Sequence, residues 1–129
     1  MGSDPLVEAA RDVQRNAYAP DSHFPVGAAL ESTDGRIFVG CNVENASFGL
    51  TVCAERVAVW AAVAAGARSF ARIVVVTDRD PPAPPCGACR QVLVEFGLDL
   101  RVDGVGPASH QVWSLEELLP HAFTRNQLT

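Results

Sequence analysis

The chain has 129 residues, of which 48% are hydrophobic and 19% charged, and its formal net charge is −5. This length and composition predict a single globular domain over residues 1–129 and exclude a disordered chain. All ten basic residues are arginines scattered singly along the chain. No basic stripe for nucleic acid is therefore present, and a small, weakly charged substrate is expected.

The N-terminal sequence, Met1-Gly-Ser-Asp-Pro5, lacks the basic and apolar regions of a signal peptide. The most apolar stretch, residues 52–67, contains Glu55 and Arg56 and is too polar to span a bilayer. We therefore expect no membrane association and a cytoplasmic location. Cysteines stay reduced there, so the four in this chain favour metal binding or catalysis over disulfides.

The first half of the chain predicts a helix, a hairpin and a second helix. Asp4 and Pro5 begin a helix whose apolar spacing extends to Tyr18. Residues 26–30 and 36–42 are predicted strands, and the Asp-Gly pair between them favours a hairpin. A loop over residues 45–51 then leads to a helix over residues 53–65.

The second half alternates strands with helices. Residues 72–77 form a nearly continuous apolar run, which is typical of a strand buried on both faces. A proline-rich loop over residues 80–85 precedes a helix over residues 86–96, a strand over residues 98–102 and a short helix from Ser114 to Pro120. This order predicts a three-layer α/β fold with a mixed sheet.

Two short motifs carry the chemistry, Cys53-Ala-Glu55 and Pro85-Cys-Gly-Ala-Cys89, and each opens a predicted helix. A helix N-terminus favours thiolate over thiol. Cys53, Cys86 and Cys89 would give zinc three sulfur ligands and leave its fourth position open, as in catalytic sites. Glu55, two residues from a ligand, would then be placed to activate water.

Other interpretations account for parts of this pattern. Cys86 and Cys89 after a buried strand also resemble a thioredoxin-like dithiol, which leaves Cys53 and Glu55 unexplained. Cys41 could complete a closed structural zinc site, although its position in the middle of a predicted strand favours a small buried thiol. Glu55 by itself could be a solvated charge on a helix surface.

The combined pattern of Cys-x-Glu and Pro-Cys-x-x-Cys resembles the zinc deaminases. Over nearly the whole chain, the sequence is similar to the small homotetrameric cytidine deaminases, in motif order and in spacing. The segments that carry this resemblance are Phe24-Pro-Val-Gly-Ala-Ala-Leu30, Gly40-Cys-Asn-Val-Glu-Asn-Ala46, Cys53-Ala-Glu-Arg56, Pro85-Cys-Gly-Ala-Cys-Arg-Gln91 and Leu118-Leu-Pro120.

The resemblance implies a three-layer α/β/α cytidine-deaminase-like domain with about five strands and one zinc ion per subunit. It implies hydrolysis of cytidine and 2′-deoxycytidine to uridine and 2′-deoxyuridine with release of ammonia, a pyrimidine salvage reaction. Zinc-activated water would attack C4, with Glu55 carrying the proton and Arg56 offsetting thiolate charge.

The resemblance also assigns substrate contacts. Asn42 and Glu44 would bind the sugar hydroxyls, Phe24 would pack on the pyrimidine, and Ala54 would contact the substrate. Phe123 would enter a neighbouring subunit's site, so the partners implied are a nucleoside and further copies of this chain. No nucleic-acid partner is implied.

Two segments depart from the family pattern. Phe48 precedes Gly49 where the family often has an aromatic residue followed by proline, so a tyrosine hydroxyl that reaches the neighbouring site is missing if Phe48 fills that place. The first loop has Asp21 after Pro20, where an aromatic residue or histidine is more usual.

The three histidines show no spacing typical of metal ligands and are expected on the surface or in loops; they are His23, His110 and His121.

Three other functions remain as alternatives. A blasticidin-S-type deaminase shares the zinc motif, and Asn42 with Glu44 favours the nucleoside instead. An inactive zinc-stabilised binding module would tolerate loss of Glu55, which is present here. A dithiol redox protein would form a reversible disulfide between Cys86 and Cys89 and would bind no zinc.

Overall fold

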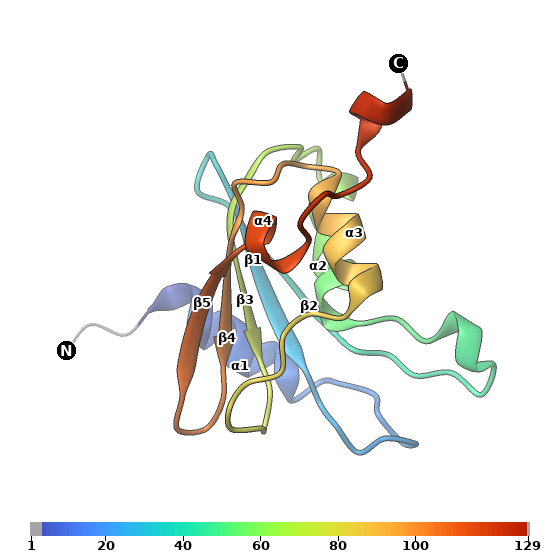
Figure 1. The fold of residues 1–129 in the computed structure, drawn as a ribbon. Helices are drawn as coiled ribbons and strands as arrows, with labels where there is room; N and C mark the ends of the chain where they lie inside the picture. Colours follow the sequence, from blue (N-terminus) through green and yellow to red (C-terminus); the bar gives the residue numbers. More distant parts are fainter. Residues whose placement is uncertain (1–3, 129) are drawn as a thin grey trace.

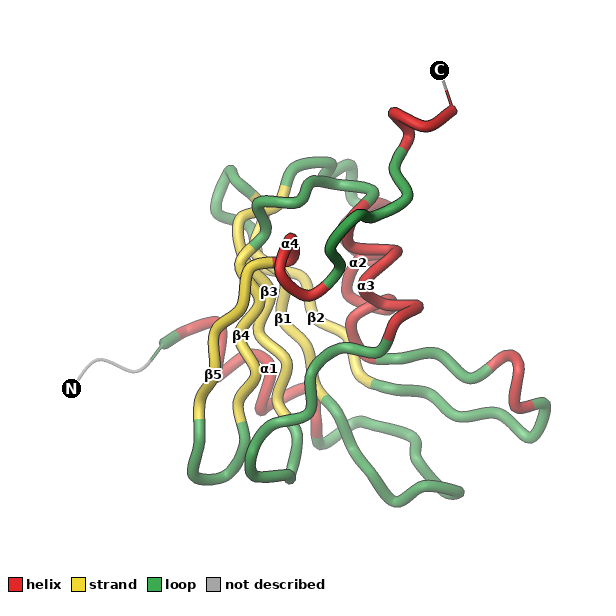
Figure 2. The backbone as a smooth tube through the Cα atoms, viewed as in Figure 1, coloured by secondary structure: helices red, strands yellow, loops and turns green. Residues whose placement is uncertain are grey.

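A computed structural model of the chain describes residues 4–128, so residues 1–3 of the segment used for the signal-peptide expectation lie outside it. Within this range, one helix covers one face of a central sheet and three cover the other (Figures 1 and 2). The helices are α1 (Pro5–Gln14), α2 (Ala54–Ala64), α3 (Gly87–Val94) and α4 (Leu115–Leu118), with 3-10 turns at Phe48–Leu50 and Arg125–Leu128. The strands are β1 (Gly27–Ser32), β2 (Ile37–Cys41), β3 (Phe70–Val76), β4 (Arg101–Val105) and β5 (His110–Ser114).

The sheet is mixed and five-stranded, in the order β2-β1-β3-β4-β5. β1 is antiparallel to both β2 and β3, β3 is parallel to β4, and β4 is antiparallel to β5. The expected three-layer α/β fold with about five strands is confirmed. β2 and β3 must run in the same direction because both oppose β1. The helices that follow them, α2 and α3, therefore begin at the same edge of the sheet.

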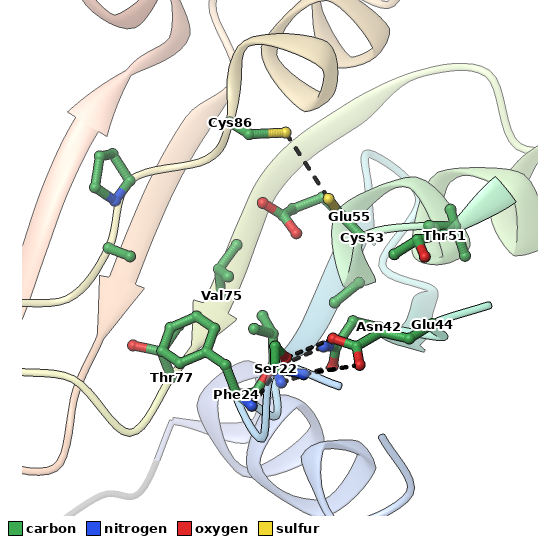
Figure 3. Close-up of a pocket in the computed structure, with 15 residues that line it drawn as sticks. Ser22, Phe24, Asn42, Glu44, Thr51, Cys53, Glu55, Val75, Thr77 and Cys86 are labelled. Atoms are coloured by element: carbon green, nitrogen blue, oxygen red, sulfur yellow. Dashed lines mark hydrogen bonds between the residues drawn. The ribbon is translucent and has the colours of Figure 1, made fainter. Parts of the chain in front are cut away.

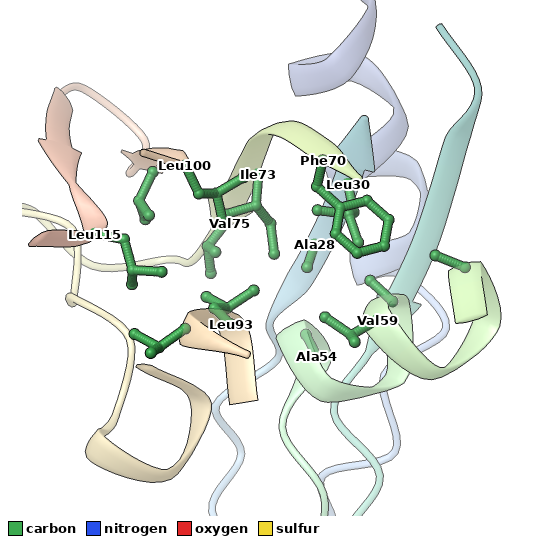
Figure 4. Close-up of a cluster of buried hydrophobic side chains, with 14 of the residues drawn as sticks. Ala28, Leu30, Ala54, Val59, Phe70, Ile73, Val75, Leu93, Leu100 and Leu115 are labelled. Carbon is green, nitrogen blue, oxygen red and sulfur yellow. The ribbon is translucent and has the colours of Figure 1, made fainter. Parts of the chain in front are cut away.

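Alternating side chains of the central strands belong to two separate hydrophobic cores, one on each face of the sheet. Leu30, Ile73 and Val75 face α2, α3 and α4 (Figure 4). Val74 and Val76 face α1 on the other side of the sheet. This alternation explains the continuous apolar run of β3, since both of its faces are covered.

Helix α2 lies unusually close to the sheet at Gly40. A Cβ atom on Gly40 would lie 2.5 Å from the carbonyl oxygen of Ala54, so only glycine permits this contact. The close approach fixes the first turn of α2, which carries the cysteine and glutamate motif.

In the described range, no helix is both long and apolar enough to cross a membrane.

The structure corrects two boundaries predicted from the sequence and adds one strand. Helix α1 ends at Gln14 and does not reach Tyr18. The strand expected over residues 98–102 lies at Arg101–Val105, and β5 was not recognised as a strand. β4 has Asp103 and Gly104 in its interior, and both residue types disfavour strands. β5 is an exposed edge strand with no apolar run to mark it.

Asp103 is fully buried, and it is held by an ion-pair network that the sequence does not reveal. Its carboxylate accepts hydrogen bonds from Arg72 (Nη2, 2.8 Å), Arg101 (Nε, 2.8 Å) and His110 (Nε2, 2.7 Å). Arg72 also pairs with Asp4, the N-cap residue of α1. His110 is exposed, in line with the expectation of a surface or loop position, but it belongs to β5 and bonds to a buried acid. The network ties α1 to β3, β4 and β5.

Asp103 also makes a testable contribution to stability. Burial opposes its ionisation, but the hydrogen bonds from Arg72, Arg101 and His110 outweigh that effect and lower the pKa of Asp103 to about 2 from 3.8. The contribution is therefore fully present above pH 4 and lost as the pH falls through 2. We expect Asp103→Asn to lower the free energy of unfolding at pH 7 by about 2 kcal/mol.

Urea denaturation at several pH values tests this expectation. The difference between wild type and Asp103→Asn should shrink as the pH falls from 4 to 2, and zinc loss shared by both proteins cancels in the difference. An equal difference at pH 2 and pH 7 would show that the charge of Asp103 is unimportant.

Candidate metal centre and active site

Two helix N-termini bring the cysteine motifs together at one edge of the sheet. Cys53 is the N-cap residue of α2, and Cys86 is the N-cap residue of α3. Cys89 lies in the first turn of α3 and is fully buried. The topology explains this meeting, because β2 and β3 run in the same direction and their following helices start side by side.

The three thiols match the dimensions of a zinc site. The Sγ atoms of Cys53 and Cys86 are 3.8 Å apart, and those of Cys86 and Cys89 are 3.5 Å apart. Tetrahedral zinc with Zn–S bonds of about 2.3 Å places its sulfur ligands about 3.8 Å from one another. Within residues 4–128 these are the cysteines that form a possible metal cluster, and Cys41 does not belong to it. The donor set therefore fits zinc with one position left open.

The charges around the thiols favour a bound cation. Hydrogen bonds from Cys89 and Arg56 lower the pKa of Cys53 to about 5, against the opposing effect of burial. The hydrogen bond to Cys53, together with burial, raises the pKa of Cys89. These opposite directions favour the thiolate at Cys53 over the thiolate at Cys89. Zinc binding would displace the remaining protons, as thiolate ligands require.

Arg56 lies directly beside the cluster. Its Nη2 atom donates to the Sγ atom of Cys53 at 3.4 Å, and the nearby thiolate raises the pKa of the guanidinium. Three thiolates and a divalent ion carry a net negative charge. Arg56 is therefore placed to offset it.

Glu55 is buried in the first turn of α2, with 5% of its surface exposed. Burial raises the pKa of Glu55 to about 7, and the neighbouring Cys53 thiolate adds to this effect. A carboxyl group with this pKa can take up and release a proton near neutral pH. Its position, two residues from one thiol and beside a cavity, suits proton transfer.

The cluster opens into a cavity of about 260 Å³. Cys53, Cys86 and Glu55 lie at one end, and Ser22, Asn42 and Glu44 lie at the other (Figure 3). The remaining lining residues are Phe24, Val26, Thr51, Val52, Ala54, Val75, Thr77, Ala83 and Pro84.

Asn42 and Glu44 hold the chain segment that carries Phe24. The amide of Asn42 donates to the carbonyl oxygen of Phe24 (2.9 Å) and accepts from the backbone N–H of Val26 (2.8 Å). The carboxylate of Glu44 accepts from the backbone N–H of Asp21 (2.9 Å) and from the hydroxyl of Ser22. Asn42 keeps one N–H and one lone pair free to meet a ligand.

Most of the residues predicted to form the site lie together. The residues expected to bind the metal, transfer the proton, offset the thiolate charge and bind the substrate either line this cavity or belong to or contact the thiol cluster. They are Cys53, Cys86, Cys89, Glu55, Arg56, Phe24, Asn42, Glu44 and Ala54. Phe123 does not line the cavity of its own chain and is 58% exposed on the C-terminal tail, which extends away from the sheet (Figure 1). Phe48 is 76% exposed and also lies outside the cavity.

Several lining residues were not predicted from the sequence. Thr51 is the last residue of the loop predicted over residues 45–51, and Thr77 is the last residue of the strand predicted over residues 72–77. Neither belongs to a motif, so no signal in the sequence indicated them. Ala83 and Pro84 lie in the proline-rich loop before Cys86. Their position close to Cys86 in the sequence could have indicated that they line the cavity, because residues that flank a metal ligand tend to line its site.

Comparison with known proteins agrees with this geometry. Residues 3–102 match the family model described as the cytidine and deoxycytidylate deaminase zinc-binding region. A probable cytidine deaminase of Dictyostelium discoideum is 49% identical, over 95% of this chain and 84% of its own length. The crystal structure of cytidine deaminase from Burkholderia pseudomallei has a TM-score of 0.90 and 50% identity, over 95% of this chain and 100% of that one. A blasticidin-S deaminase of Bacillus cereus is 33% identical, over 94% of this chain and 91% of its own length.

Proposed function

This chain belongs to the family of cytidine and deoxycytidylate deaminases, and we propose that it is a zinc-dependent cytidine deaminase. The reaction is the hydrolysis of cytidine and 2′-deoxycytidine to the corresponding uridines and ammonia. One observation carries the proposal, namely that three thiols spaced for zinc and the buried carboxyl group of Glu55 meet at the end of one small cavity.

The chain's own residues divide the work at the reacting end. Cys53, Cys86 and Cys89 would hold the ion, which when bound supplies a Lewis acid that makes water nucleophilic near neutral pH. Glu55 takes one proton from the attacking water and delivers it to N3 of the cytosine ring. It then takes the second proton from the hydroxyl formed at C4 and delivers it to the amino group, which leaves as ammonia. Its pKa near 7 suits both directions of transfer. Arg56 limits the negative charge that the thiolates place next to Glu55.

The distal end of the cavity suits a sugar. The free hydrogen-bonding capacity of Asn42 and the carboxylate of Glu44 would receive ribose hydroxyls. Phe24, in the segment that these two residues hold in place, would pack against the pyrimidine, and Ala54 lines the cavity beside Glu55. The cavity accepts one small molecule, which fits the acidic net charge of the chain and the absence of a basic stripe.

A substrate panel tests this assignment against the alternatives. Cytidine and 2′-deoxycytidine should both be converted, with free cytosine far slower because it lacks the sugar that Asn42 and Glu44 would bind. Blasticidin S is the informative competitor, since a blasticidin-S deaminase is among the relatives. A kcat/KM higher for blasticidin S than for cytidine would reassign the substrate, and no turnover of any compound by zinc-loaded protein would favour the inactive binding module.

We also propose that the protein is a homotetramer whose active sites are completed by neighbouring subunits. Trp60 on α2 is 55% exposed and borders an apolar groove between α2 and α3, and Phe123 is exposed and reaches no site in its own chain. Both side chains are expected to be covered by other copies of the chain.

The three thiol ligands must stay reduced, which favours the cytoplasm as the location.

Light scattering during gel filtration tests the assembly. Four chains of 13.7 kDa give a mass of about 55 kDa. A species of about 14 kDa with full activity would overturn the tetramer and the completion of the site by a neighbour.

A further inference from the structure

We propose that Asp80 is a positioning residue, which fixes the loop over residues 78–85 as a wall of the substrate cavity. This inference rests on the proposed function only for its kinetic consequence. The loop connects β3 to α3, and two of its residues, Ala83 and Pro84, line the cavity.

The loop has few backbone hydrogen bonds of its own. It has no helix or strand, and four of its eight residues are prolines, which restrict φ but have no N–H to donate. Pro82 and Pro85 are buried, and the position of the loop relative to the cavity depends on its contacts with neighbouring segments.

The turn between β4 and β5 supplies that external support. The two carboxylate oxygens of Asp80 each lie 3.1 Å from the backbone nitrogen of Ala108, and one also accepts from the hydroxyl of Ser109. Hydrogen bonds to an ionised acceptor contribute more than neutral ones. The carboxylate therefore joins the middle of the loop to the tip of a hairpin.

The shape of the hairpin shows that the two segments fit closely. A Cβ atom on Gly106 would lie 2.2 Å from the carbonyl oxygen of Arg79 and 2.3 Å from Oδ1 of Asp80. The absence of a side chain at Gly106 is thus required for the Asp80 carboxylate to reach its donors, the N–H of Ala108 and the hydroxyl of Ser109. The contact between Gly106 and the carbonyl oxygen of Arg79 involves the backbone alone, so it locates this junction separately from the hydrogen bonds of Asp80.

The end of the loop near the metal ligands is held separately. Nε of Arg90 donates to the carbonyl oxygen of Pro85 at 2.7 Å, directly before Cys86. Loss of the Asp80 contacts should consequently free Ala83 and Pro84 while leaving Cys86 in place. The expected effect is on substrate binding and not on zinc binding.

The variant that tests this proposal is Asp80→Ala, with Asp12→Ala as the matched control. Asp12 is an exposed carboxylate on α1, far in sequence from the cavity residues, with a side chain 73% exposed. We expect Asp80→Ala to raise KM for cytidine about 10-fold, the loss that corresponds to one charge-assisted hydrogen bond. Its kcat should change less than about twofold, and its zinc content should match wild type. Asp80→Asn keeps one acceptor oxygen and should give a smaller rise in KM.

Amide hydrogen exchange over residues 77–89 provides a readout that does not depend on the reaction. Faster exchange in Asp80→Ala together with the rise in KM supports the proposal, and a folded variant with wild-type exchange or wild-type KM overturns it. Ser109→Ala removes one of the same bonds and serves if Asp80→Ala does not fold. If wild type fails to convert cytidine, the proposed function is wrong, and hydrogen exchange alone then decides whether Asp80 fixes the loop.

Discussion

Glu55→Gln should lower kcat for cytidine by about 10³- to 10⁴-fold while zinc remains bound. Proton transfer by a positioned side chain contributes about 10²- to 10⁴-fold to a rate, and Glu55 would carry the proton in more than one step. Glutamine has nearly the same shape but cannot exchange a proton. Steady-state kinetics beside a metal assay measure both parts of this result.

The melting temperature of Glu55→Gln distinguishes a loss of proton transfer from damage to the fold. Glu55 is buried, and burial raises the pKa of its carboxyl group, which means that the ionised form is disfavoured there. A neutral glutamine should therefore leave the melting temperature unchanged or raise it. Glu8→Gln, on the exposed face of α1, is the control and should keep full activity. A Glu55→Gln enzyme with more than about a tenth of wild-type kcat would remove Glu55 from the mechanism.

Cys86→Ser should abolish zinc binding and reduce activity by at least about 10³-fold, because serine does not supply a thiolate ligand. Cys86 is exposed at the start of α3, so the substitution itself should be tolerated by the fold. Metal that binds only the folded state stabilises it, and the melting temperature should fall when that metal is lost.

Cys41→Ser is the matched control for this prediction. Cys41 lies at the end of β2 and outside the thiol cluster, so its variant should keep one zinc per chain. Zinc loss in Cys41→Ser would instead support a four-cysteine structural site. Zinc retained by Cys86→Ser would contradict the proposed ligand set.

The reacting end of the site could be predicted from the sequence because its signals are local. Cys53 and Glu55 are two residues apart, Cys86 and Cys89 are three apart, and each pair sits at a helix start that ordinary spacing rules locate. What spacing could not show is why the two motifs meet. That meeting depends on β2 and β3 running in the same direction, which follows from strand pairing over long sequence separations.

The remaining features depend on contacts that leave no pattern in a single sequence. Asp103 resembles a residue unsuited to a strand until its partners on β3 (Arg72), on its own strand β4 (Arg101) and on β5 (His110) are known. Asp80 looks like an ordinary loop acid, and its partners belong to a hairpin whose second strand, β5, has no apolar run. Phe123 has no contact with the cavity in one chain, so its expected role requires the neighbouring subunit.

The most direct test of the central proposal is ultraviolet-monitored incubation of cytidine with purified, zinc-loaded protein, together with an assay for ammonia. The arrangement of Cys53, Cys86, Cys89 and Glu55 predicts that one uridine and one ammonia form for each cytidine consumed. Unchanged cytidine in the presence of folded protein carrying one zinc per chain would contradict the assignment as a cytidine deaminase.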